Sequence, residues 1–100
     1  MKRIPKAFKL MGHTITVRVV NKMDWDAISD KYGIEDAVGY WSPRDQLILI
    51  KRGKPSLVVH TFWHEVTHAV LDSLNDKLSN NETFVDNFSG LLAQAVQTFE

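Results

Sequence analysis

The chain of 100 residues contains no cysteine. Disulfide bonds are therefore excluded, and so is every metal site that uses a thiolate ligand. Any zinc ion bound by this protein must be held by histidine nitrogen or by aspartate and glutamate oxygen. With only four histidines in the sequence, nitrogen ligands are scarce.

Neither sign of charge is in excess, because 12 lysines and arginines balance 12 aspartates and glutamates. A balanced chain has no net field to attract nucleic acid or an anionic membrane, so we expect neither as a partner. No apolar run is long enough to span a membrane, and none of signal-peptide length follows the charged first residues. These features predict a cytoplasmic protein.

Linkers, internal repeats and low-complexity tracts are also missing from the sequence. A chain of this length without a Pro/Gly/Ser-rich break is expected to build one core. We therefore expect residues 1–100 to form a single domain.

Alternating apolar and polar residues indicate the first elements. The pattern predicts a strand over residues 13–20 and a shorter strand over residues 7–10. A short helix follows, in which we expect Asp24 to cap the start and Gly33 to end the last turn. This helix is expected to pack against the sheet.

Two further runs, residues 37–41 and 46–51, flank a turn-rich tetrad at 42–45 and predict a β-hairpin. The second run is apolar on both faces, as an interior strand is. The first contains Gly39, which an interior strand tolerates poorly, so this arm is expected to form the sheet edge.

Two helices complete the chain. The first is expected over residues 55–74, with Pro55 in its first turn and Ser56 as a possible cap. After a loop at 75–81, a second helix carries an apolar stripe that we expect to pack along the core: Phe84, Phe88, Leu91, Leu92, Ala95, Val96 and Phe99. The order of elements predicts an α+β fold with a short, twisted, mostly antiparallel sheet, a backing helix and two long helices.

The pattern His-Glu-x-x-His occurs once, from His64 to His68, inside the first long helix. On a helix, residues four apart lie about 40° apart around the axis, so both imidazoles can reach one metal ion. Glu65 lies about 100° from His64, near enough to touch a water on that ion without binding the ion itself. The alternative is a pair of ordinary surface histidines.

A catalytic zinc site needs a third protein ligand, and the candidates downstream are Asp72 and Glu82. Asp72 lies one turn beyond His68 on the same helix, so it reaches along the helix axis rather than across it. The loop at 75–81 is long enough to bring Glu82 back beside the histidines. Asp86, one turn later, could accept the outer N–H of a ligand histidine. Alternatively, Asn81 and Glu82 only cap the last helix.

His64 to His68, together with Asn81-Glu82-Thr83-Phe84-Val85-Asp86, resembles the two signatures of the gluzincin metallopeptidases, His-Glu-x-x-His and Asn-Glu-x-x-x-Asp. The short gap between them is similar to that of the minimal, ImmA/IrrE-like gluzincins. The resemblance implies a small zincin-like domain with an active-site helix and a C-terminal glutamate helix. It further implies one zinc ion per chain held by His64, His68 and Glu82, Glu65 as general base, and Asp86 as the partner of a ligand histidine.

The expected function is therefore hydrolysis of peptide bonds by zinc-activated water. In larger thermolysin-like enzymes a histidine or tyrosine from a further C-terminal domain stabilises the oxyanion, and the substitutes here are Tyr40, Arg44 and His60. We expect a peptide or protein substrate to pair with the edge arm, where Gly39 would allow close approach. The alternative is a zinc-stabilised interaction or regulatory module, weak or silent as a catalyst. Self-inhibition by the segment 1–6 is a further possibility.

Overall fold

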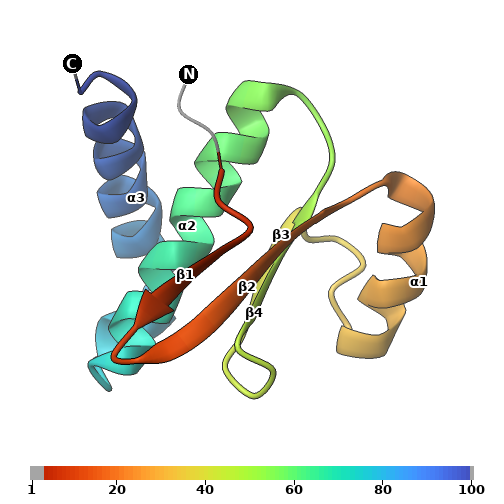
Figure 1. Cartoon of the computed structure of the whole chain (residues 1–100), viewed down its shortest axis with the longest axis horizontal. Helices are drawn as coiled ribbons and strands as arrows, with labels where there is room; N and C mark the ends of the chain where they lie inside the picture. Colours follow the sequence, from red (N-terminus) through yellow and green to blue (C-terminus); the bar gives the residue numbers. More distant parts are fainter. Residues whose placement is uncertain (1–3, 100) are drawn as a thin grey trace.

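The computed structural model describes residues 4–99, so half of the segment 1–6 lies outside the described residues. Two pairs of strands, each followed by a helix, precede the last two helical segments (Figure 1). The elements are β1 Ala7–Leu10, β2 His13–Val20, α1 Lys22–Tyr32, β3 Gly39–Ser42, β4 Leu47–Lys51, α2 Pro55–Ser73, the 3₁₀ helix η1 Lys77–Asn80 and α3 Glu82–Gln97. The expected small α+β fold is confirmed.

The four strands form one mixed sheet in the order β1-β2-β4-β3. β1 pairs with β2, and β3 with β4, in antiparallel fashion, whereas β2 and β4 run parallel, with Val17 opposite Ile48. Two of the three pairings are therefore antiparallel, as expected. The assignment of β4 to the interior of the sheet and of β3 to its edge is also confirmed.

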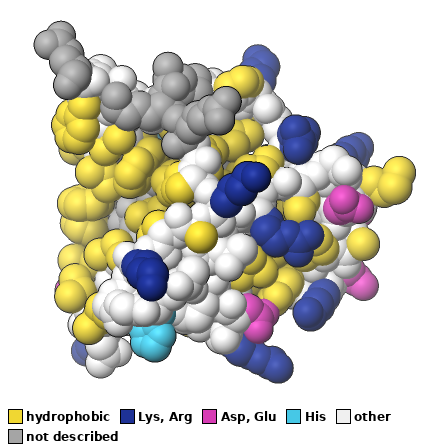
Figure 2. Space-filling model, viewed as in Figure 1, with side chains coloured by type: hydrophobic (Ala, Val, Ile, Leu, Met, Phe, Trp, Pro, Cys, Tyr) yellow, Lys and Arg dark blue, Asp and Glu magenta, His cyan; other side chains and the backbone are white. Residues whose placement is uncertain are grey.

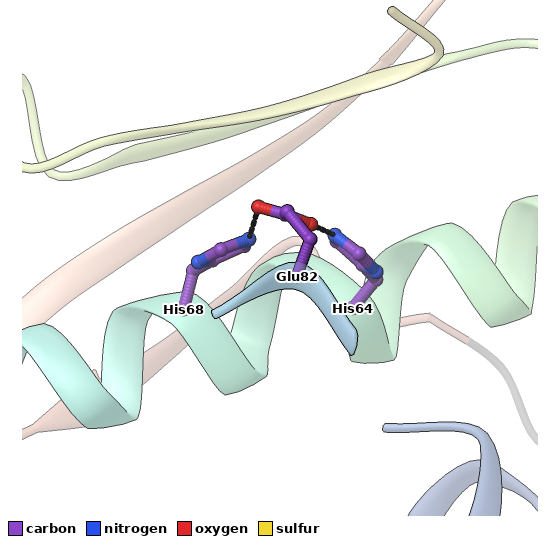
Figure 3. A group of neighbouring side chains, drawn as sticks. All are labelled: His64, His68 and Glu82. Atoms are coloured by element: carbon purple, nitrogen blue, oxygen red, sulfur yellow. Dashed lines mark ion pairs between the residues drawn. The ribbon is translucent and has the colours of Figure 1, made fainter. Parts of the chain in front are cut away.

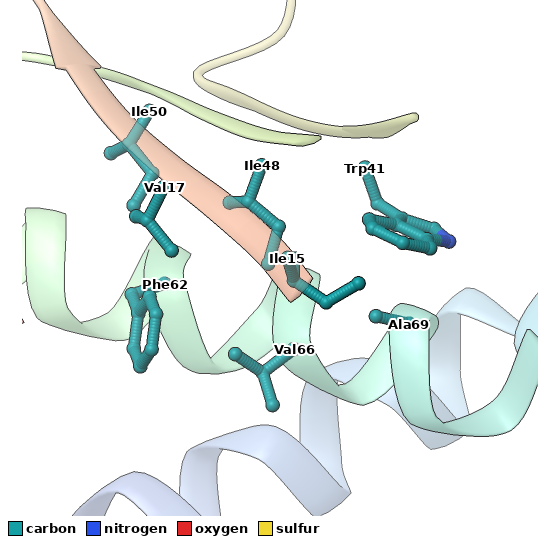
Figure 4. Packing of buried hydrophobic residues seen from close by; sticks show 8 residues of the cluster. All are labelled: Ile15, Val17, Trp41, Ile48, Ile50, Phe62, Val66 and Ala69. Carbon is teal, nitrogen blue, oxygen red and sulfur yellow. The ribbon is translucent and has the colours of Figure 1, made fainter. Parts of the chain in front are cut away.

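Each face of the sheet builds its own core, because successive side chains of a strand point to opposite faces. Ile48 and Ile50 face α2 and pack with Phe62, Val66 and Ala69 of that helix (Figure 4). On the other face, the fully buried Leu49 packs with Val20 and with Trp25 of α1. The result is a layered molecule in which α1 covers one face of the sheet, α2 covers the other, and α3 lies outside α2 (Figure 1).

α1 begins three residues earlier than the sequence suggested. Asn21 is the N-cap, and its side-chain oxygen accepts a hydrogen bond from the backbone N–H of Asp24 at 2.8 Å. Asp24 therefore lies in the first turn, and its prediction as the cap was wrong. The expected end at Gly33 is confirmed, since this residue has φ of 69°, a left-handed conformation that glycine adopts without strain.

α2 starts at Pro55, as predicted, but Ser56 does not cap it. Lys54 occupies the N-cap position and makes no side-chain capping bond. Proline at the first helical position fixes a helical φ and has no N–H to satisfy, which is how this helix can start without a capping side chain.

α3 buries a different stripe from the one expected. Its buried residues are Val85, Ser89 and Ala93, four apart along the face that packs on α2. Four of the seven residues predicted to line the core are exposed: Phe88, Leu91, Ala95 and Phe99. The apolar arc of α3 is wider than the part that α2 covers. The sequence pattern therefore predicted the apolar arc correctly, but the prediction of which half of it is buried was wrong.

Candidate metal centre

The His-Glu-x-x-His pattern lies within α2. Because of the helical repeat, the two histidines point in one direction and the glutamate in another. His64 and His68 lie side by side, with ring centroids 5.0 Å apart and side chains 19 % and 14 % exposed. Glu65 turns toward the sheet and is 7 % exposed. The motif thus gives two half-buried imidazoles and a buried carboxyl on neighbouring faces of one helix.

Glu82 completes the group, because the chain turns back after α2 and starts α3 beside the two histidines. Asn81 caps α3 by accepting a hydrogen bond from the backbone N–H of Phe84 at 3.0 Å, which places Glu82 in the first turn. The Glu82 carboxylate lies between the rings, with Oε2 3.3 Å from His64 Nε2 and Oε1 3.1 Å from His68 Nε2 (Figure 3).

These donor atoms fit a zinc ion in chemistry and in spacing. One ligand atom from each of His64, His68 and Glu82 can be chosen so that all lie within 4.8 Å of one another. Tetrahedral zinc with ligands at its usual bond lengths separates its ligand atoms by about 3.4 Å. The two His–Glu distances are close to that value.

Both histidines are held at their other ring nitrogen. His64 Nδ1 lies 2.9 Å from Asp86 Oδ1, and His68 Nδ1 lies 3.3 Å from the hydroxyl of Ser79. Such outer contacts orient an imidazole and leave Nε2 to face the metal position. Ser79 is buried in η1, and its role is not among those predicted from the sequence. A lone serine in a polar loop belongs to no motif, so only its place beside His68 reveals it.

Glu65 lies between the histidines and the edge strand. Burial, followed by the negative charge of Glu82, raises the pKa of the Glu65 carboxyl to about 8. Gly39 of β3 faces this carboxyl, and a Cβ added there would overlap Thr61 Cγ2 and lie 2.9 Å from Glu65 Oε2. The packing of α2 therefore requires a glycine at this position, which is a different role from the close approach of substrate that we predicted for Gly39.

A cleft of about 530 Å³ opens in front of these groups. One wall is the edge strand, with Gly39, Tyr40 and Trp41, and the other is α2. Trp41 Nε1 donates a hydrogen bond to Asp72 Oδ2 at 2.7 Å, so this bond joins the two walls. Asp72 does not belong to the group of converging ligand atoms, which agrees with the expectation that it reaches along the helix.

The three candidates for stabilising an oxyanion lie in different places. Tyr40 is one of the residues that line the cleft, but its ring packs 5.0 Å from that of Tyr32, on the face of the sheet that α1 covers. Arg44 is exposed in the hairpin turn and does not line the cleft. His60 is exposed on α2 and lies near Gly90 of α3, in a separate groove. The structure therefore brings only the first of the three to the cleft.

Comparisons with protein-family models, with curated proteins and with solved structures found no match to this chain. Among residues 4–99, no helix is both long and apolar enough to cross a membrane.

Proposed function

We propose that the protein is a zinc-dependent metallopeptidase of the gluzincin type, as the resemblance of its two signatures implies. The observation that carries the proposal is the convergence of His64 Nε2, His68 Nε2 and the Glu82 carboxylate beside the buried carboxyl of Glu65. Two imidazoles and one carboxylate are a donor set used by catalytic zinc sites, which keep a further position open. We propose one zinc ion per chain.

When bound there, zinc would act as a Lewis acid that polarises a carbonyl group and makes water more acidic. The role of Glu65 is to accept a proton from the attacking water and to return it to the nitrogen of the leaving amine. A carboxyl that is shielded from solvent and has a raised pKa is suited to holding that proton near neutral pH.

The edge strand supports an extended peptide as the substrate. The backbone N–H of Lys51 donates to the carbonyl of Val38 at 2.8 Å, so Val38 belongs to a hydrogen-bonded pair of the antiparallel ladder. Hydrogen-bonded and non-bonded pairs alternate, which leaves the N–H and C=O groups of Gly39 and Trp41 facing away from β4. A peptide lying along the cleft can pair with these groups as an additional strand.

One observation favours the second candidate, a zinc-stabilised module that binds a partner without cleaving it. Of the three candidate oxyanion groups, only Tyr40 lines the cleft. A site without a well-placed donor for the oxyanion loses roughly 10²- to 10³-fold in rate. The expected cytoplasmic location remains part of either proposal.

The experiment that decides between them is digestion of a peptide library by zinc-loaded wild type and by Glu65→Gln, each checked for metal content. Glutamine keeps the shape of the side chain and removes the proton acceptor, so hydrolysis should fall by about 10²- to 10⁴-fold while zinc content stays near one. Cleavage that continues unchanged in the variant would exclude Glu65 as the base. If wild type cleaves nothing across a broad library, the binding module is favoured.

A further inference from the structure

α3 exposes more apolar surface than a solvent-facing helix needs. Phe88 is 48 % exposed and Leu91 is 70 % exposed, and both lie on the arc next to the buried stripe. Residues 87–99 contain no charged residue, so only neutral side chains such as Asn87, Gln94 and Thr98 mark the solvated side of this part of the helix. This arc was predicted to be buried, but among residues 4–99 Phe88 and Leu91 stay exposed.

Two hollows accompany the exposed arc. One, of about 300 Å³, lies between α2 and α3 and is lined by Val66, Val70, Leu74, Phe84, Phe88 and Leu92, among others. The rings of Phe84 and Phe88 stack in its wall at 5.6 Å. The second, of about 310 Å³, shares Val66 and continues the apolar surface toward Phe8 of β1. Figure 2 shows hydrophobic side chains along the edge of the molecule where α3 lies in Figure 1.

We propose that this apolar face of α2 and α3 binds a second copy of the chain, related to the first by a twofold axis. The first argument is area. Leu74 is 66 % exposed, and together with Phe88 and Leu91 it offers roughly 350 Å² per copy. A standard interface buries about 800 Å² per partner, so these three side chains supply nearly half of it, and a rim of exposed polar residues such as Asn87 and Gln94 would supply the rest.

The second argument is that the face is complementary to itself. A twofold contact pairs one patch with an identical patch, so the same surface must carry both protrusions and hollows. Leu91 and Leu74 protrude, and the two hollows lie beside them. Since the formal net charge of the chain is zero and residues 87–99 are uncharged, two copies meet here without repulsion.

The proposed contact leaves the candidate metal centre accessible. Glu82 and Asp86 lie on a different face of α3, and the cleft opens toward β3 rather than toward the apolar arc. Dimer formation should therefore be independent of zinc and of catalysis.

The test is to measure molar mass by light scattering and sedimentation equilibrium over a range of concentrations, with a chelator present. Wild type should have twice the mass of the 11.4 kDa chain, and Leu91→Glu should remain at 11.4 kDa. Leu91 is mostly exposed, so the variant should keep the helical circular dichroism of wild type. The matched control is Met23→Glu on α1, across the sheet, where an 80 % exposed side chain should leave the dimer intact.

The lack of cysteine permits a second measurement. Leu91 lies near the middle of α3, where a twofold axis between antiparallel copies of the helix would pass. Leu91→Cys should therefore form a covalent dimer on mild oxidation, whereas Met23→Cys should not. The proposal is overturned if wild type stays monomeric at all concentrations, if its dimer persists in Leu91→Glu, or if the two cysteine variants cross-link equally. A monomer that instead takes up another partner on this face would also overturn it.

Discussion

The two sides of the α2–α3 pair differ in what holds them together. On one side, His64 and Asp86 approach to 2.9 Å, and the other polar contacts join single atoms at 3.1 Å and 3.3 Å. On the other side, Val66 and Phe88 line an open apolar hollow. On each helix the two kinds of residue are only two positions apart, which is about 200° around the axis. The same pair of helices can therefore carry an atom-specific site and a general apolar surface without either disturbing the other.

The largest expected effect is on the polar side. Glu82→Ala removes one of the three converging ligands, and zinc affinity should fall by at least about 10³-fold because two histidines alone bind zinc weakly. The matched control is Phe84→Ala, two residues along, which should change the affinity by less than about 3-fold. Competition titration against a chromophoric chelator measures both.

Asp72→Ala serves as a second control in the same titration. The Asp72 carboxylate accepts the indole N–H of Trp41 and lies outside the converging group, so zinc affinity should be nearly unchanged. If Asp72→Ala were the damaging change, the third ligand would have been assigned wrongly.

A smaller effect is expected at Asp86, which contacts a ligand histidine rather than the metal position. Asp86→Asn keeps the size of the side chain but weakens the charge-assisted contact to His64 Nδ1, and zinc affinity should fall by about 10- to 100-fold. Phe88→Asn, on the apolar side of the same helix, is the matched control and should have no such effect. An unchanged affinity in Asp86→Asn would leave Asp86 as an ordinary surface carboxylate.

The polar side also carries an energetic cost in the metal-free protein, which the apolar side does not. The pKa of Glu65 is about 8 in the folded state and has an ordinary value of 4.5. Folding therefore favours the protonated carboxyl; this contribution to stability is complete below pH 4.5 and is lost as pH rises to about 8. A bound cation would offset the charge of Glu82, so the cost applies without metal.

Glu65→Gln does not titrate, so in the presence of chelator it should become more stable than wild type as the pH rises. We expect the difference in melting temperature to grow by at least about 10 °C between pH 5 and pH 8.5. A difference that stays constant over this range would show that Glu65 titrates in the folded protein as it does in the unfolded chain.

The smallest effect is expected at Ser79. Ser79→Ala removes a neutral hydroxyl 3.3 Å from His68 Nδ1, a longer and weaker contact than the one that Asp86 makes, so zinc affinity should fall by less than about 10-fold. Ser73→Ala is the matched control, because that hydroxyl donates to the carbonyl of Ala69 within α2 rather than contacting a histidine. Equal effects in the two variants would exclude a specific role for Ser79.

Much of the fold could be predicted because it depends on neighbours in the sequence. The bounds of β1 and β2 follow from alternation along each strand, and the start of α2 follows from Pro55. The direction of the two histidines follows from the helical repeat alone. Predicting the position of Glu82 required only a loop long enough to bring the chain back to the histidines. In the structure its carboxylate lies between the two rings.

The features that could not be predicted depend on distant partners. Nothing local shows that Gly39 must make room for Thr61 and Glu65, or that Ser79 lies beside His68. Which half of the apolar arc of α3 is buried depends on where that helix crosses α2. The position of this crossing cannot be predicted from the apolar pattern of α3 alone. The prediction of the N-cap of α1 failed for a simpler reason. Asn21 and Asp24 are both good capping residues and lie three positions apart.

The parallel pairing of β2 with β4 bears on the order in which the molecule assembles. β3 with β4 and α2 with α3 are each joined by a short connection, whereas β2 reaches β4 only after α1 and β3 have been traversed. Contacts between neighbouring segments form faster than a crossover of that length. All residues of the candidate centre lie between Gly39 and Asp86, within the rapidly formed part. We therefore expect the metal ligands to meet early in folding, and closure of the β2–β4 pair to be the slower step.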